Sequence, residues 1–240
     1  MKEEPLFLLK YGEKVYMHSL ITKGEVFLNT RKHYQDIEDM EIGDSWEAID
    51  EIRQADSISI SYVDKVHWET FAIDTPVGIS YDWKPKGNVY CTYGVRLNHF
   101  DGQPLHIVPK EVECKFGDTI VLIHAKEFLN RIQVQLSKQG YSFESRFVQY
   151  YDPKEIDGKI DAFQKRDIFS HQSEYRIFVE NDKDESIKIT IGSIEDIAQI
   201  CNDDMVKFEL DGKDYVIYPS MGDLNPNDII LNDKVDSQQK

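Results

Sequence analysis

Residues 169-FSHQSEYRIFVE-180 combine large apolar side chains with two glutamates, an arginine, a histidine and a glutamine. Val, Ile, Phe and Tyr favour extended backbone, so the segment predicts a strand over 174–180. Glu174 lies where this strand would enter a sheet, on the same face as Gln172 and Arg176, because side chains alternate along a strand. Its carboxylate is a solvated edge charge, one half of a buried ion pair with Arg176, or a catalytic group.

The composition indicates a folded protein of one large or two small domains, with 240 residues of which 40% are hydrophobic. Three cysteines without a C-x-x-C pattern favour reduced thiols and argue against a disulfide framework or a cysteine zinc site. No apolar run approaches the roughly 18 residues that a membrane-spanning helix needs. The first residues do not resemble a signal peptide. We therefore expect a cytoplasmic protein with no membrane partner.

The net charge of −16 disfavours a protein that is permanently bound to nucleic acid. Its field repels phosphates at long range, and stable binders present a basic face. A local basic patch would still permit transient contact with RNA or DNA. Arg31, Lys32 and His33 form a small basic cluster of this kind, and it is either solvated surface or a phosphate contact.

The pattern of apolar residues predicts an α+β fold dominated by antiparallel strands. Strands are expected over 6–10, 25–30, 57–62, 88–95, 118–124, 146–151, 174–180, 186–192, 205–210 and 214–218. Helices are expected over 13–24, 46–52, 126–140 and 194–201.

Several local signals support these assignments. Strict alternation in 57-SISISY-62 predicts a half-buried strand. Ser193 predicts the start of the last helix, and Asp211-Gly212 predicts a hairpin turn. We expect a single domain over 1–221, followed by a polar tail at 222–240.

Common catalytic motifs are absent from the sequence. It contains no P-loop, no dinucleotide-binding glycine pattern, no H-E-x-x-H and no G-x-S-x-G. The seven histidines show no helical pair beside a third ligand, so no metal site is specified. A metal-dependent nuclease would have to use Asp36, Glu38, Asp39 and Asp44, which a solvated helix surface explains more simply.

The pieces LLKYG, GEVFLNTRKHYQD, VYCTYGV, FSHQSEYRIFV and IGSIEDI resemble a group of bacterial proteins without an established activity. The order of the polar pieces also resembles the ADP-ribosyltransferase superfamily. That superfamily has a split antiparallel sheet that grips NAD. Its signature is a polar residue, Arg or His, on the first strand, a Ser- or Tyr-bearing second strand, and a glutamate on a later strand, which in the toxin branch ends a Q-x-E or E-x-E turn.

In this chain the first piece is Lys10 and Tyr11, or His18. The second is Tyr34, or the pair Ser57 and Ser59 in an S-I-S run where the toxins have S-T-S. The third is Gln172-x-Glu174. The resemblance implies a single α+β domain with a mainly antiparallel, split sheet and flanking helices.

The resemblance also implies roles for these residues. Glu174 would hold the ribose hydroxyl and stabilise an oxocarbenium-like ion, and Gln172 would orient the acceptor. Tyr34 or Tyr11 would stack on the nicotinamide ring, and Lys10 would contact the adenosine ribose or the pyrophosphate. The candidate catalytic residues are Glu174, Gln172 and Tyr34. The candidate NAD-binding residues are Lys10, Tyr11, His18, Asn29, Thr30, Ser57, Ser59 and Arg176.

The expected function is that of an NAD-dependent mono-ADP-ribosyltransferase-like enzyme, acting as an intracellular toxin or phage-defence effector. NAD would be its substrate, the acceptor a protein or nucleic acid, and an antitoxin or regulator its partner. The alternative is a non-catalytic module that recognises a protein or nucleotide, in keeping with the acidic surface and Trp46, Trp68 and Trp83. Simpler explanations also stand: an ordinary charge ladder of Glu174 and Arg176, and Cys91 as a small buried hydrophobe.

Overall fold

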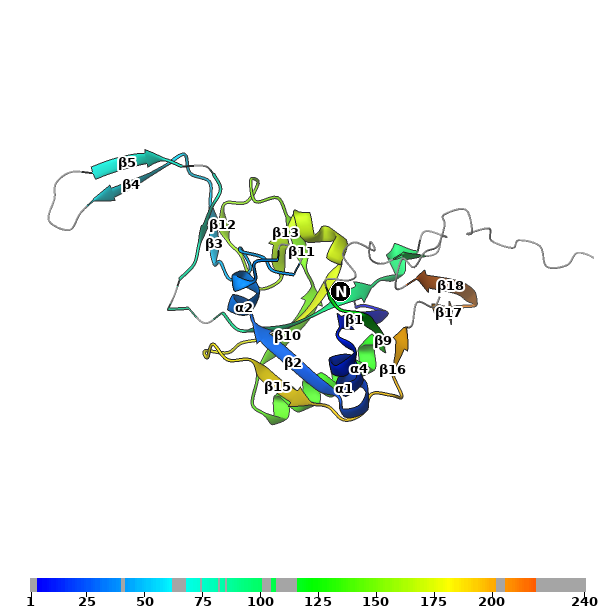
Figure 1. Ribbon diagram of the computed structural model, residues 1–240. Helices are drawn as coiled ribbons and strands as arrows, with labels where there is room; N and C mark the ends of the chain where they lie inside the picture. Colours follow the sequence, from blue (N-terminus) through cyan, green and yellow to red (C-terminus); the bar gives the residue numbers. More distant parts are fainter. Residues whose placement is uncertain are drawn as a thin grey trace, which may run out of the picture.

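An antiparallel sheet forms the centre of an α+β fold (Figure 1). The computed structural model describes residues 4–39, 42–61, 68–73, 75–81, 83, 84, 86–100, 105, 106, 116–201 and 206–218. The sheet comprises β1 (Phe7–Gly12), β2 (Glu25–Thr30), β7 (Asn88–Val95), β9 (Thr119–His124), β10 (Phe143–Phe147), β14 (Glu174–Val179), β15 (Ile187–Thr190) and β16 (Ala198–Cys201). Its main row runs β10-β14-β7-β1-β9-β16, and β2 joins β7 to β15.

The described residues also form four smaller sheets. They are β3 (Glu51–Arg53) with β6 (Val77–Ile79) and β12 (Gly158–Lys159); β4 (Ser57–Ser61) with β5 (Trp68–Ala72); β11 (Gln149–Tyr151) with β13 (Gln164–Arg166); and β8 (Leu105–His106) with β17 (Val206–Leu210) and β18 (Lys213–Tyr218). The described helices are α1 (Lys14–Lys23), α2 (Arg31–Asp36) and α4 (Ala125–Lys138), with 3-10 helices η1 (Leu97–His99) and η2 (Asp167–Gln172). None of these helices is long and apolar enough to cross a membrane.

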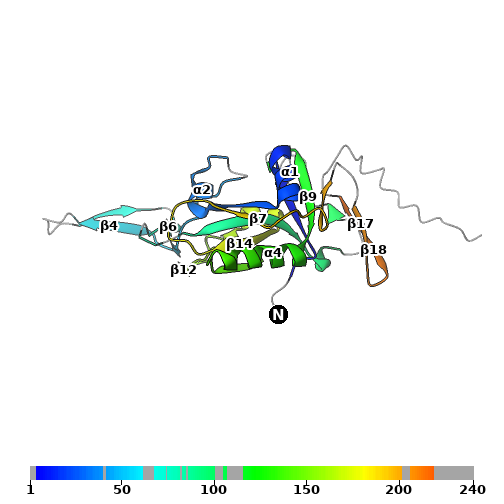
Figure 2. The same cartoon turned by 90° about the horizontal axis from the view of Figure 1, so that it is seen from below.

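Helix α4 covers one face of the sheet (Figure 2). Its residues Phe128, Ile132 and Leu136 recur every fourth position, so they form one stripe, and each is fully buried. They belong to the same core cluster as Leu8 and Tyr90 of the sheet. The side chains of Glu174 and Arg176 on β14 and of Cys91 on β7 alternate with Tyr175 and Tyr90 and so lie on the other face of the sheet.

The sheet splits beside β7. Strand β1 pairs with β7 only over Phe7–Leu9, and β2 pairs with β7 only through Asn29 and Thr30. Residues 90–92 of β7 are bonded to β14 on one side, whereas neither β1 nor β2 pairs with them on the other. Lys10 reaches into this opening, where its Nζ donates a hydrogen bond of 2.8 Å to the Cys91 carbonyl oxygen.

Most sequence-predicted elements are confirmed, including the helices over 13–24 and 126–140. The strands over 6–10, 25–30, 88–95, 118–124, 174–180 and 186–192 are also confirmed, as is the hairpin at Asp211-Gly212. Gly24 ends α1 in the left-handed conformation, with φ 66°. The tail predicted at 222–240 lies outside the described residues.

The helix predicted over 46–52 is wrong. The Trp46 amide donates to the Asp44 carboxylate, and the Glu47 amide donates to the Asp44 carbonyl, so the chain turns. It then enters β3, where Ile52 is fully buried.

The helix predicted over 194–201 is also wrong. Ser193 bonds the Glu195 amide, but only one turn follows. Residues 198–201 instead pair with β9 as strand β16, because an open sheet edge offers hydrogen bonds to the whole segment.

Two strand predictions need correction. The segment 146–151 divides into β10 and β11, because the Val148 amide bonds the Glu174 carbonyl and the chain then pairs with β13. The segment 57–62 is not half-buried. Its strand β4 pairs only with β5 in an arm that projects from the body (Figures 1 and 2), and Ile58 and Ile60 are 47% and 46% exposed.

Candidate active site

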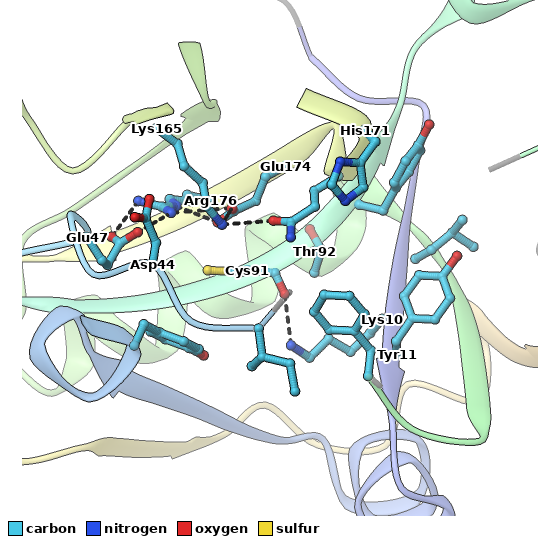
Figure 3. Close-up of a pocket in the computed structure, with 16 residues that line it drawn as sticks. Lys10, Tyr11, Asp44, Glu47, Cys91, Thr92, Lys165, His171, Glu174 and Arg176 are labelled. Atoms are coloured by element: carbon cyan, nitrogen blue, oxygen red, sulfur yellow. Dashed lines mark hydrogen bonds and ion pairs between the residues drawn. The ribbon is translucent and has the colours of Figure 1, made fainter. Parts of the chain in front are cut away.

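A cleft of about 240 Å³ opens where the sheet splits (Figure 3). Aromatic and aliphatic side chains form much of its wall, and most of the charged side chains gather at one side, across the cleft from Lys10. The lining residues are Leu9, Lys10, Tyr11, Tyr34, Ile42, Asp44, Glu47, Cys91, Thr92, Tyr93, Phe116, Lys165, His171, Gln172, Glu174 and Arg176.

Six of the sequence-predicted residues meet in this cleft: Lys10, Tyr11, Tyr34, Gln172, Glu174 and Arg176. They come from β1, α2, η2 and β14. The left-handed conformation of Ser173, with φ 38°, turns the chain sharply between η2 and β14. Gln172 and Glu174 therefore stand on either side of a turn at the rim of the sheet.

The other candidates lie elsewhere. Asn29 bonds the Tyr34 hydroxyl and so supports the wall from behind. The Thr30 hydroxyl oxygen accepts from the His33 amide at 3.0 Å and caps α2. His18 lies on the exposed side of α1.

Ser57 and Ser59 are exposed on the β4–β5 arm and do not line the cleft. The Ser59 hydroxyl is 2.8 Å from that of Thr70. Among the described residues, β4 pairs with β5 alone, so no strand pairing joins these serines to the central sheet.

Glu174 is 4% exposed and sits at the centre of an ion-pair network. Its Oε1 accepts from Arg176 Nε, and its Oε2 lies 3.1 Å from Lys165 Nζ. Burial alone would raise the pKa of this carboxyl, but Arg176 and Lys165 outweigh burial and hold the pKa well below its usual range. The carboxylate is thus ionised at neutral pH. The solvated edge charge is excluded, and the buried pair with Arg176 is confirmed.

Every N–H of the Arg176 guanidinium is taken. Besides the Glu174 contacts of Nε and Nη2, Nη1 and Nη2 each lie 2.7 Å from an oxygen of Glu47, and Nη1 donates to the Ala162 carbonyl. The side chain is 1% exposed. Arg176 therefore positions Glu174 and Glu47, and it has no N–H left with which to bind a cofactor.

Lys10 and Cys91 occupy the opening in the sheet. Burial lowers the pKa of the Lys10 amine, although Cys91 and Glu174 partly oppose this effect. The amine lies 4.6 Å from the centre of the Tyr90 ring. Burial, followed by the charge of Glu174, raises the pKa of the Cys91 thiol. This thiol stays protonated and hydrogen-bonded to Glu174, so it is not a nucleophile.

Glu47 and Lys165 were missed in the sequence. Lys165 bridges Gln172 and Glu174, because its Nζ lies 2.8 Å from Gln172 Oε1 and 3.1 Å from Glu174 Oε2. Glu47 pairs with Arg31 at 3.2 Å as well as with Arg176. Neither residue stands at a spacing that links it to Glu174. Only the three-dimensional fold brings these segments together.

The buried network has one more cation than carboxylates. Three carboxylates, those of Asp44, Glu47 and Glu174, meet the side chains of Arg31, Lys165, Arg166 and Arg176. Lys10 adds a further amine at the opposite side of the cleft. Among the residues that line the cleft itself, the cations Lys10, Lys165 and Arg176 balance the carboxylates Asp44, Glu47 and Glu174, and Arg31 and Arg166 lie outside its wall.

Among the described residues, no group of three His, Cys, Asp or Glu side chains is arranged to hold a metal ion. Comparisons of the chain with models of protein families, with curated proteins and with solved structures find no match.

Proposed function

We propose that the cleft binds NAD and that the protein transfers ADP-ribose from NAD to a macromolecular acceptor. One observation carries this proposal: the adjacent strands β14, β7 and β1 present Glu174, Tyr93 and Lys10 around a single cleft. ADP-ribosyltransferases distribute their signature over a first strand, a second strand and a later glutamate. The second piece would here be Thr92-Tyr93 of β7, in place of Tyr34 or the serines of β4.

The register of the strands supports this assignment. Tyr93 is the pairing partner of Leu9 in β1 and of Glu174 in β14. Residues that oppose each other across strands share a face of the sheet. The ring of Tyr93 and the carboxylate of Glu174 therefore face the same ligand volume.

Transfer of ADP-ribose needs a fixed negative charge beside the ribose more than it needs a strong base. Cleavage of the bond between ribose C1′ and the nicotinamide nitrogen leaves neutral nicotinamide and an oxocarbenium-like ribosyl cation. The acceptor then adds to C1′ and releases a proton to solvent. Glu174, kept ionised by Arg176 and Lys165, would hold a ribose hydroxyl and stabilise the developing positive charge.

The shape of the cleft suggests how much of NAD it takes. Its volume of about 240 Å³ lies below the roughly 300–1,000 Å³ typical of pockets for drug-sized ligands. The nicotinamide ring and its ribose would occupy the part lined by Tyr11, Tyr93 and Phe116. The pyrophosphate would lie near Lys10, and the adenosine would extend beyond the cleft.

The test is nicotinamide release and transfer of labelled ADP-ribose in a cell lysate. Wild type should label acceptors, and Glu174→Gln should lose about 100- to 1,000-fold, the usual effect of removing one group that stabilises a transition-state charge. Glu180→Gln, an exposed change just after the same strand, is the matched control. Equal labelling by wild type and Glu174→Gln, or labelling by neither, would contradict the proposal.

The saturated contacts of Glu174 favour a second candidate, in which the cleft recognises a nucleotide without chemistry. Both carboxylate oxygens already accept from Arg176 or Lys165. This candidate predicts calorimetric binding of NAD with no release of nicotinamide. If transfer occurs, a role as a toxin or phage-defence effector restrained by an antitoxin predicts that wild type, but not Glu174→Gln, arrests growth when expressed alone.

A further inference from the structure

A second groove, of about 270 Å³, lies on the other side of α2 from the cleft. Helix α2 contributes Tyr34 to the cleft, whereas its Lys32 and Gln35 line this second groove. Its other lining residues include Ser80, Trp83, Lys84, Lys86 and Gly87, and the segment 181–184. Unlike the cleft, the groove is lined mainly by polar side chains.

Trp83 offers a free aromatic face at this groove. Its side chain is 80% exposed, the highest value among the exposed large apolar residues described. Its ring centre lies 5.7 Å from that of Tyr81, whose hydroxyl donates to Glu51 at 2.8 Å. Tyr81 is thereby anchored and supports the indole from one side. The other face is available for a stacked planar group.

Lysines give the groove a positive charge. Lys84 and Lys86 share one carboxylate, that of Asp50, whose side chain is only 4% exposed. Lys32 lies 3.8 Å from Asp184, and both side chains are more than half exposed, so this pair is weak and easily exchanged.

Lys183 lines the same groove, and so does the acid Asp182. In total, the four lysines named here face three carboxylates. Lys84 and Lys86 are held in place by the buried Asp50. Because lysines outnumber carboxylates here, the groove is cationic within a protein of net charge −16.

We infer that this groove binds a nucleotide, with the base stacked on Trp83 and the phosphate among Lys32, Lys84 and Lys86. An exposed aromatic ring beside lysines is the arrangement that binds unpaired nucleotides. The overall negative charge repels long polyanions, so the ligand is short: a free nucleotide or the end of a single strand. The inference does not depend on the proposed function, because no cleft residue takes part in it.

Calorimetric titration with ADP, and separately with a five-nucleotide single-stranded oligoadenylate, tests the inference. We expect binding of at least one ligand that weakens as salt is raised. Trp83→Ala should weaken it roughly 5- to 100-fold, the range for loss of one stacked base. Equal affinity for the two ligands identifies a free-nucleotide site, and tighter binding of the oligonucleotide identifies a strand end.

Further variants separate this groove from the cleft. The double change Lys32→Gln with Lys183→Gln should weaken binding, whereas Lys188→Gln, an exposed lysine on β15, should not. Tyr11→Ala removes a cleft ring and should leave this binding intact. The inference is overturned if neither ligand binds at millimolar concentration, or if binding survives Trp83→Ala but is lost in Tyr11→Ala.

Discussion

Glu174 and Arg176 stand two residues apart on β14 and bind each other on the same face of the sheet, with side chains 5% and 1% exposed. Neither residue is a surface charge. Arg176 compensates Glu47 in addition to Glu174, so one guanidinium neutralises two buried carboxylates. The site is therefore stable only as a complete network.

Replacing Arg176 with Met should destabilise the protein by about 3–5 kcal/mol, because two buried carboxylates lose their counter-ion. Urea denaturation measures this loss. The matched control is Arg146→Met. Arg146 lies opposite Arg176 on the neighbouring strand β10, but it binds Asp161 at a partly exposed position. The control should lose less than about 1 kcal/mol. Equal losses in the two variants would contradict a buried network.

Acid should lower the unfolding free energy of wild type more steeply than that of the Glu174→Gln variant. The pKa of Glu174 is lower in the folded protein than the value near 4.3 of an unfolded chain. Its stabilisation is therefore complete above about pH 4.3 and is lost as the pH falls toward the folded pKa. Below about pH 4, the unfolding free energy of wild type should drop by up to about 1.4 kcal/mol more per pH unit than that of the variant. Parallel pH profiles would contradict this assignment.

Lys10 should make the stability of wild type rise with pH in the alkaline range, and Lys10→Met should lack this rise. Burial lowers the folded pKa of Lys10 below the unfolded value near 10.4. The cost of burying its charge is thus fully present below the folded pKa and disappears as the pH rises toward 10.4. Between pH 7 and 10, wild type should gain stability relative to Lys10→Met in urea denaturation. A constant difference would mean that the amine is not desolvated.

Changes on the β4–β5 arm should leave ligand binding in the cleft intact. Ser57→Ala and Ser59→Ala alter exposed hydroxyls that are not part of the cleft wall. Tyr11→Ala removes one ring of that wall, and we expect it to weaken NAD binding by calorimetry at least several-fold. A loss of binding in the serine variants would place the ligand on the arm instead.

The sequence was most informative where local pattern and tertiary environment agree. Helix α4 is amphipathic in sequence and covers a sheet, and β7 and β9 are apolar in sequence and buried. The segment 194–201 shows the limit. Its helix-capping signal was real, since Ser193 does bond the Glu195 amide, but pairing with the edge of β9 outweighed it.

The candidate site was predictable only in part. Glu174, Gln172 and Lys10 were identifiable because they stand at the ends of predicted strands. Glu47 and Lys165 were not, because their charges are related to Glu174 only through the folded chain. Ser57 and Ser59 were misplaced because strict alternation predicts a strand but not what covers it.

The bond between Glu47 and Arg176 joins residues 129 positions apart. Closing so long a loop is slow and comes late in folding, since local elements form before distant contacts compensate the lost chain entropy. A nascent chain that has not yet emerged past β14 therefore holds Glu47 and Arg31 without the partner that completes the site. Glu47 and Arg31 therefore remain without Glu174 and Arg176 as ion-pair partners until β14 has been synthesised.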